Sequence, residues 1–255
     1  MTDACASLVE EGDPDRFAAT MAAPAAVRWK LWPLYAANLE IARAPWAASE
    51  PMVAEMRLQW WIDTITDLAA GFDRPGHPVT ECLAPMLQGD PTLAPLLAEI
   101  AEARRWDCWR DPFEDREAFE AYLDQTSGNL IWAAALTLGA PSSCEGPVRD
   151  FAWGAGLAAY LRAAPELEAR GRFPFADGRP ETLRALATEG RARIARAKAA
   201  AIPRIARPAL WSGATADAVL KRAEHDPCRI ADGRLNLSPL ARKWALLNRA
   251  MTGRF

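Results

Sequence analysis

Two acidic residues in the sequence have the spacing of a metal-binding pair. Asp63 and Asp67 are four residues apart in a stretch with helical periodicity, so their carboxylates would share one face of a helix. Carboxylate oxygens are the ligands that Mg²⁺ prefers. The alternative is a solvated acidic face, because Gly71 follows closely and charged side chains near a helix end usually face solvent. We favour the solvated face and predict no metal site here.

The residue types that hold zinc or act as nucleophiles are scarce. The only histidines are His77 and His225, and the five cysteines are far apart in sequence with no C-x-x-C pair. A histidine or thiolate metal site is therefore not expected, and we assign no catalytic residue. An odd number of dispersed cysteines is typical of reduced thiols in a cytoplasmic protein.

Three arginines could bind an anion. Arginine holds a phosphate or carboxylate group through two parallel hydrogen bonds, and Arg57, Arg162 and Arg172 all lie in helical or helix-flanking segments. The alternative for each is an ordinary ion pair within or between helices. The sequence leaves both interpretations open.

The helix that the rest of the chain is organised around is predicted over residues 51–70. Its apolar positions recur at intervals of four and three residues, at Ala54, Leu58, Trp61, Ile65 and Leu68. Arg57 and Trp60 flank this seam. The adjacent pair Trp60 and Trp61 indicates either core packing or the wall of an apolar site.

The same period, with proline and glycine at the ends, predicts further helices over residues 13–21, 24–45, 78–87, 92–109, 111–139, 147–164, 181–202, 203–211, 217–223 and 238–251. The stretch from Leu130 to Leu138 is apolar almost all round, which is typical of a helix in the middle of a bundle. Gly154 and Gly156 would let a neighbour or a ligand approach closely. No long alternating run occurs, so we predict one all-α domain over residues 1–255, with residues 1–12 flexible.

Composition limits the partners. The formal net charge is −3 and there is no long basic run, so nucleic acid is not expected as a partner. Residues 1–12 lack the basic start and apolar core of a signal peptide. The longest nearly apolar run, residues 151–161, is about half of a membrane span. We expect a soluble, cytoplasmic protein with at most peripheral contact with the inner membrane, where Arg191, Arg193, Arg196 and Arg204 could reach anionic lipid.

Several stretches together resemble one family. They are Leu34-Tyr35-Ala-Ala-Asn38-Leu39, Met56-Arg57-Leu-Gln59-Trp60-Trp61, the segment from Tyr122 to Gly139, and Tyr160-Leu-Arg162-Ala-Ala-Pro-Glu166-Leu-Glu-Ala-Arg170-Gly-Arg172. In this order they resemble the squalene and phytoene synthases, the head-to-head prenyl transferases of the isoprenoid synthase fold. The resemblance covers residues 13–176 and implies an all-α helical bundle of that fold.

The chain departs from this family at its metal site. The family's synthases hold Mg²⁺ with two aspartate-rich motifs, because the diphosphate leaving group needs its charge neutralised. The aspartate positions of the first motif fall here at Ala42, Arg43 and Trp46, and those of the second at Ala163 and Leu167. Glu166 is the only carboxylate left in the second motif. We therefore predict no cofactor, and Mg²⁺ only if the chain is an active synthase after all.

A branch of the family whose aspartate motifs are eroded, and which assists assembly of respiratory complex I, resembles the chain better. This resemblance implies a catalytically degenerate protein that binds an isoprenoid or lipid ligand, or a complex I subunit or assembly intermediate. The alternatives are an active prenyl diphosphate transferase and a ligand-free helical scaffold. We predict an elongated apolar pocket between the helices that contain Tyr35, Trp61, Leu130 and Gly156. The predicted ligand-binding residues are Tyr35, Asn38, Arg57, Gln59, Trp60, Trp61, Gln125, Gly128, Gly156, Arg162 and Arg172.

Overall fold

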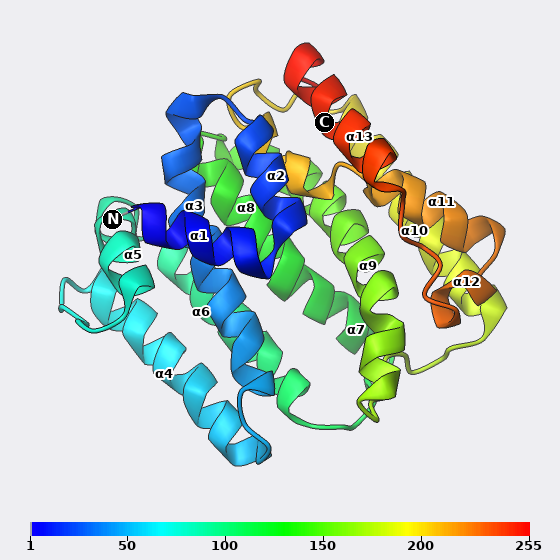
Figure 1. Cartoon of the computed structure of the whole chain (residues 1–255), viewed down its shortest axis with the longest axis horizontal. Helices are drawn as coiled ribbons and strands as arrows, with labels where there is room; N and C mark the ends of the chain where they lie inside the picture. The colour runs from blue at the N-terminus through cyan, green and yellow to red at the C-terminus, as the bar shows by residue number, and fades with distance from the viewer. Residues whose placement is uncertain (1) are drawn as a thin grey trace.

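The computed structural model describes residues 2–255, which form helices and connecting segments with no strand among them (Figure 1). The α-helices are α1 (Thr2–Gly12), α2 (Pro14–Ala22), α3 (Ala25–Arg43), α4 (Pro51–Ala69), α5 (Pro78–Gly89), α6 (Leu93–Ala103), α7 (Arg116–Leu123), α8 (Asn129–Thr137), α9 (Glu145–Ala169), α10 (Pro180–Ala199), α11 (Ala216–His225), α12 (Cys228–Ala231) and α13 (Pro239–Thr252). Short 3₁₀ segments include η1 (Ala44–Trp46), η2 (Arg104–Cys108) and η5 (Arg207–Gly213). The all-α prediction is confirmed.

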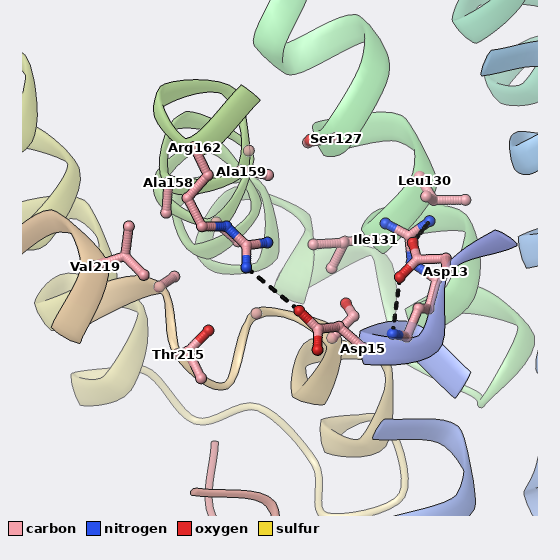
Figure 2. A pocket seen from close by; sticks show the side chains of 16 residues that line it. Asp13, Asp15, Ser127, Leu130, Ile131, Ala158, Ala159, Arg162, Thr215 and Val219 are labelled. Carbon is pink, nitrogen blue, oxygen red and sulfur yellow. Dashed lines mark hydrogen bonds and ion pairs between the residues drawn. The ribbon is translucent and has the colours of Figure 1, made fainter. Parts of the chain in front are cut away.

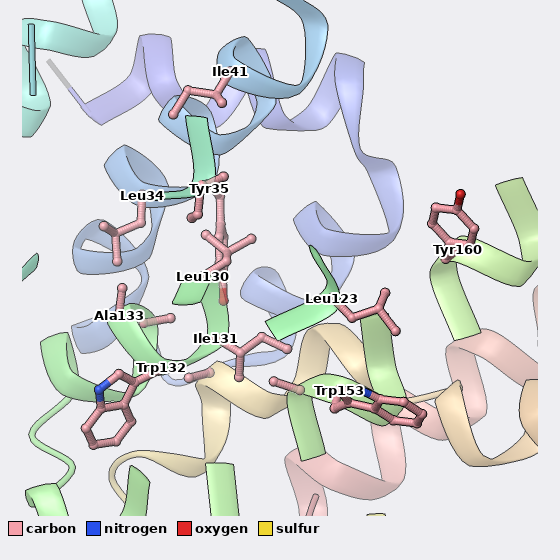
Figure 3. Close-up of a cluster of buried hydrophobic side chains, with 14 of the residues drawn as sticks. Leu34, Tyr35, Ile41, Leu123, Leu130, Ile131, Trp132, Ala133, Trp153 and Tyr160 are labelled. Carbon is pink, nitrogen blue, oxygen red and sulfur yellow. The ribbon is translucent and has the colours of Figure 1, made fainter. Parts of the chain in front are cut away.

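Helix α8 lies in the middle of the bundle, as its apolar sequence predicts. Every residue from Asn129 to Ala135 is buried, and the helix contacts α3, α6 and α9 (Figure 1). Figure 3 shows the core around it, where Leu130 and Ile131 lie among side chains of other helices. This core extends from Cys5 in α1 to Leu220 in α11 as one contiguous cluster.

The N-terminal segment differs from the expectation. Residues 1–12 were expected to be flexible, but Thr2–Gly12 is helix α1, packed on α3 and α5. Cys5 and Val9, four residues apart, are fully buried in the core. These two small apolar side chains anchor the helix, which also carries the acidic residues Asp3, Glu10 and Glu11.

The helix predicted over residues 111–139 is interrupted. It begins at Arg116, because the side chain of Asp115 accepts a hydrogen bond from the Ala118 amide at 2.8 Å and so caps the helix at that point. Between α7 and α8 the chain forms a π-helix, η3 (Asp124–Gly128). Wide turns of this kind add one residue to a helix and re-aim the side chains that follow.

The glycines of α9 serve contacts between helices. A Cβ atom on Gly154 would lie 2.8 Å from the carbonyl oxygen of Gly190 in α10, and one on Gly156 would lie 2.6 Å from Cβ of Ser127. Glycine at these positions therefore allows α10 and η3 to approach α9 closely. The room that Gly154 and Gly156 leave beside α9 is occupied by Gly190 of α10 and Ser127 of η3.

No helix within residues 2–255 is long and apolar enough to cross a membrane.

Candidate functional site

The two segments that correspond to the family's metal motifs meet at the C-terminal ends of α3 and α9. Helix α3 runs into η1, which carries Trp46, and α9 ends in a turn at Gly171, whose φ of 75° lies in the left-handed region. This turn brings the Arg172 amide within 3.0 Å of the Leu167 carbonyl oxygen. As a result the side chains of Arg170 and Arg172 lie on either side of the turn and both contact Trp46.

Trp46 and these two arginines form what we call the tryptophan–arginine cluster. The guanidinium carbons of Arg170 and Arg172 lie 4.6 and 4.5 Å from the centre of the Trp46 ring, which is the geometry of cation–π contacts. A groove of about 660 Å³ borders the cluster and is lined also by Ser49, Trp109 and Asp111. Trp46 stands at one of the aspartate positions of the first motif, and Arg170 and Arg172 follow the second motif along the chain.

Arg172 is held in place by backbone carbonyl groups. Its side chain is 8% exposed and donates hydrogen bonds to the carbonyl oxygens of Trp106, Asp107 and Trp109, all in or next to η2. It has no carboxylate ion-pair partner within the described chain, and burial lowers its pKa. Three hydrogen bonds to carbonyl groups and the contact with Trp46 hold the guanidinium in place, so fewer of its five N–H groups remain for an external anion.

A second buried polar group lies behind Arg172. The carboxylate of Asp107, 3% exposed, accepts a hydrogen bond from Nη1 of Arg104 at 2.9 Å and another from the Tyr122 hydroxyl at 3.0 Å. Burial, together with the negative charge of Asp107, raises the pKa of Tyr122 well above its usual range. The Asp107 carboxylate is paired with both neighbours, whereas Nε of Arg104 is buried without a hydrogen-bond partner in the described chain. The three groups join η2 to α7.

Aromatic rings occupy the space between α7 and α9. Trp106 stacks on Phe113 with ring centres 3.9 Å apart, and Phe119 meets Tyr160 edge to face at 5.0 Å. The Tyr160 hydroxyl donates to the Pro174 carbonyl oxygen at 2.8 Å. Together the rings of Trp106, Phe113, Phe119, Tyr122, Tyr160 and Phe175 form one contiguous cluster. Behind the tryptophan–arginine cluster the bundle is therefore filled by side chains.

The residues present do not fit a magnesium cluster. Glu166, the remaining carboxylate of the second motif, pairs with Arg170 at 2.8 Å, and Arg43 pairs with Glu40 at 3.1 Å. Three or more metal-ligating side chains do not come together anywhere in residues 2–255. Two or three divalent ions need a surplus of carboxylates, and this region has a surplus of arginines.

The alternative pair Asp63 and Asp67 is also engaged by other side chains. Asp63 accepts a hydrogen bond from Nε2 of Gln59 at 2.7 Å, and Asp67 forms an ion pair with Arg74. Both groups lie on the outward face of α4. This agrees with the solvated acidic face that we favoured from the sequence.

The predicted residues of α4 line a separate groove. Trp60 and Trp61 meet edge to face with ring centres 4.9 Å apart, and His77 lies 5.3 Å from Trp61. Trp61 is 4% exposed and belongs to the core, whereas Trp60 is 40% exposed. Together with Arg57 they line an opening of about 260 Å³. Arg57 is exposed. Gln59 does not line this opening, and its side chain is hydrogen-bonded to Arg105 and Asp63.

Arg162 and Gly156 lie at a different cavity, of about 110 Å³, shown in Figure 2. Nη1 of Arg162 pairs with Asp15 of α2 at 3.3 Å, and Nη1 of Arg242 reaches the same carboxylate at 2.7 Å. Leu130 also lines this cavity. Pockets that hold small organic ligands are typically ~300–1,000 Å³, so this cavity is too small for a prenyl chain.

The remaining predicted residues are placed elsewhere. Tyr35 and Asn38 are buried in the core, where burial raises the pKa of Tyr35 to about 12 (Figure 3). Gln125 is exposed, and Gly128 lies beneath the ion pair between Asp124 and Arg149.

The structure therefore does not gather Tyr35, Trp61, Leu130 and Gly156 around one elongated pocket. Tyr35 and Trp61 do not line the cavity beside Gly156. Helices α3 and α9, which carry Tyr35 and Gly156, each pack on α8, which carries Leu130, whereas α4 packs on α5 and α6. The sequence interpretation missed the contact of Trp46 with two arginines and the group formed by Asp107, Arg104 and Tyr122. A signal for the latter was present, because Asp107 stands between Trp106 and Cys108-Trp109, and an acidic residue among side chains that tend to be buried needs a partner.

These features define an all-α bundle in which Trp46, Arg170 and Arg172 meet where the two eroded motifs end, beside a groove of about 660 Å³. Residues 9–176 match the family model described as squalene/phytoene synthase. This match covers more than half of the chain, so the chain belongs to the squalene/phytoene synthase family. The resemblance seen in the sequence is confirmed.

Two curated relatives are similar to the chain over part of its length. They are the proteins named NADH dehydrogenase (ubiquinone) complex I, assembly factor 6, of Homo sapiens and of Bos taurus. Each is 24% identical over 163 residues, which is 63% of this chain and 48% of the relative. The chain thus spans about half the length of the curated relatives it matches.

Two solved structures have the same fold over nearly the whole chain. A dehydrosqualene synthase in complex with ligand superposes with a TM-score of 0.78 at 16% identity, covering 98% of this chain and 95% of that one. Squalene synthase HpnC from Alicyclobacillus acidocaldarius gives 0.72 at 13% identity, covering 88% and 93%. Both likenesses show the isoprenoid synthase helical fold.

Proposed function

We propose that this chain is a catalytically degenerate member of its family that works by binding a partner and assists the assembly of respiratory complex I. The observation that carries the proposal is the tryptophan–arginine cluster of Trp46, Arg170 and Arg172. Ionisation of a diphosphate needs metal ions to neutralise the charge that develops on the leaving group. A region with two arginines around an indole ring has no ligands for those ions.

The proposed role in complex I assembly rests on the names of two relatives. Two proteins named as complex I assembly factors align with 63% of the chain. Assembly is a task of binding, and binding survives the loss of a metal site. The partner is proposed to be a subunit or an assembly intermediate of complex I.

A second candidate is binding of an apolar ligand, and one groove favours it. It measures about 490 Å³ and lies between α3, α5 and the end of α8. Most of its lining is apolar, including Trp29, Pro33, Met86, Leu93 and Leu136. Its volume falls in the range of small-molecule pockets, and each buried methylene of a prenyl or acyl chain would contribute about 0.8 kcal/mol. Native mass spectrometry of the protein with lipid extract, compared with Leu136→Trp, tests this: a retained mass lost in the variant supports the candidate, and no retained mass removes it.

The test of the main proposal is a deletion strain. We expect less assembled NADH:quinone oxidoreductase on a native gel and lower NADH-dependent quinone reduction, with unchanged pigment and triterpene content. A matched control is complementation with the triple variant Asp63→Asn, Asp67→Asn, Glu166→Gln, which removes the candidate metal carboxylates. Full rescue by this variant is expected. Normal complex I with depleted terpenoids, or failure of the variant alone, would overturn the proposal.

A further inference from the structure

Helix α13 carries an exposed apolar stripe. Leu240, Trp244, Leu247 and Met251 are 78%, 61%, 49% and 64% exposed. At 100° per residue these four side chains fall within an arc of roughly 60°. The helix has no buried residue, although its sequence is amphipathic. In a globular protein the apolar stripe of a surface helix normally faces the core.

Helix α13 is oriented the opposite way, with its apolar stripe facing away from the protein. The face opposite the stripe contacts the protein, where Arg242 pairs with Asp15 at 2.7 Å and Leu246 packs on the small cluster of Ala19, Ala23 and Trp211. Arg249 faces the same way, and burial lowers its pKa. The Arg242–Asp15 ion pair and the packing of Leu246 thus attach the helix, and its apolar stripe points away from the body of the protein. In Figure 1 α13 lies at the outer edge of the bundle, next to the C-terminus.

Cations without carboxylate partners surround the stripe. Lys243 flanks it on the helix, and Arg254 follows the helix end. Arg207 donates to the Gly253 carbonyl oxygen at 3.1 Å, and Arg204 lies against Gly253. Lys198 lines a groove of about 370 Å³ with Arg207, Arg254 and Phe255. Within residues 2–255, none of these five cations forms an ion pair.

The arginines named from the sequence are placed differently. Arg191 pairs with Asp217 and Glu224, Arg193 with Glu189 and Glu120, and Arg196 with Asp150. Their charges are neutralised on the surface of α10. Of the four arginines expected to reach a membrane, Arg204 alone belongs to the unpaired group around α13.

We infer that α13 is a membrane-surface helix that lies flat on an anionic lipid bilayer, with Trp244 and Leu247 among the lipid chains. An amphipathic helix with a Trp- and Leu-containing apolar face and flanking basic residues is typical of such binding. Tryptophan prefers the boundary between headgroups and chains. At 14 residues the helix is about 21 Å long, enough to lie along the surface and too short to span it.

Charge argues against the competing occupant, a second copy of this chain. A symmetric dimer through the stripe would bring the same patch of each copy together, so that Lys243 and Arg254 of both copies would be gathered at one interface. Like charges brought together at an interface oppose association. A surface of phosphate groups removes that repulsion. The inference goes beyond the proposed role in assembly, and it does not depend on it.

The experiment is co-sedimentation of the full chain with vesicles. Neutral phosphatidylcholine vesicles are compared with vesicles that contain a third of phosphatidylglycerol, at low and high salt. We expect binding to the anionic vesicles alone, weakened by salt. Leu247→Glu should reduce partitioning at least tenfold, because an inserted apolar side chain is replaced by a charge. Lys243→Gln with Arg254→Gln should reduce it roughly 25-fold, at about fivefold for each cation.

A matched control is Met56→Glu, which adds the same charge at an exposed apolar residue of α4, 70% exposed and far from α13 in the sequence. This variant should bind vesicles with nearly the affinity of the unaltered chain, because α4 and α13 lie at opposite sides of the bundle and salt screens a charge that is far from the bilayer (Figure 1). Equal loss in Met56→Glu and Leu247→Glu, or no binding to anionic vesicles at low salt, would overturn the inference. A concentration-dependent dimer mass that Leu247→Glu abolishes would also overturn it, in favour of a second copy.

Discussion

The guanidinium carbon of Arg172 lies 4.5 Å from the centre of the Trp46 ring, although the two residues are far apart in the sequence. Trp46 ends η1, which follows α3, and Arg172 follows α9, so the contact ties together the ends of the two helices that carry the eroded motifs. A cation beside an indole ring is favourable and needs no ion. The ends of α3 and α9 are therefore held together at this point by packing of the Trp46 and Arg172 side chains.

Arg172 should be important for stability. Replacing it by methionine keeps much of the volume but leaves the carbonyl oxygens of Trp106, Asp107 and Trp109 without their donor. We expect the free energy of unfolding, measured in urea, to fall by about 3 kcal/mol. Arg234→Met, at a residue whose side chain is 70% exposed, serves as the control and should leave the midpoint nearly unchanged. A loss for Arg172→Met as small as that of the control would contradict the structure.

The three tyrosines predict the alkaline limit of the fold. They are the only tyrosines in the chain, and all are buried. Burial raises the pKa of Tyr35 to about 12 and raises those of Tyr122 and Tyr160 further. Because the unfolded chain releases these protons near pH 10, the stabilising contribution is complete below that pH and is lost as pH rises above it.

Absorbance at 295 nm measures this directly. The folded protein should show no tyrosinate up to about pH 11, and then a cooperative rise that coincides with loss of ellipticity. The same chain in guanidinium should titrate three groups near pH 10. Gradual ionisation of one tyrosine in the folded protein near pH 10 would show that the ring is accessible to solvent.

Glycine at position 154 should be required for helix packing. An alanine there would place Cβ 2.8 Å from the Gly190 carbonyl oxygen, which is backbone and cannot rotate away, so Gly154→Ala should destabilise the protein by about 1–3 kcal/mol. Gly146→Ala on the same helix is the matched control, since its Cβ meets nothing within 4 Å. The control should be neutral or slightly more stable, because alanine favours helix over glycine. If Gly154→Ala is tolerated equally well, α9 has spare room for a ligand.

Much of the fold was predictable because its signals are local. Periodic apolar residues, proline at the first helical position and glycine soon after the last one mark α4 and α13 within a few residues, whereas α9 extends five residues beyond its predicted end at Ala164. Helix α1 was missed because only Cys5 and Val9 are buried, which is too few apolar residues to outweigh its charges. The π-helix was missed because a wide turn changes no residue type in the pattern.

The candidate site was predictable only in part. The loss of aspartates is visible in Ala42, Arg43 and Trp46, because it depends on residue identity alone. The contact of Trp46 with Arg170 and Arg172 joins segments that are far apart in the chain, so no local pattern announces it. For the same reason the predicted pocket residues, from Tyr35 to Arg172, proved to lie in several different places.

The central claim, that the chain has no metal-dependent prenyl transfer, is tested most directly by an assay of inorganic diphosphate release. Purified protein is incubated with farnesyl or geranylgeranyl diphosphate and Mg²⁺, beside an active dehydrosqualene synthase as positive control. Loss of even one stabilising group typically costs ~10²–10³ in rate, so loss of most ligands of an ion cluster should abolish turnover. We expect diphosphate and condensed product at the level of the no-enzyme control. Release of diphosphate above that level, together with squalene or phytoene, would contradict the claim.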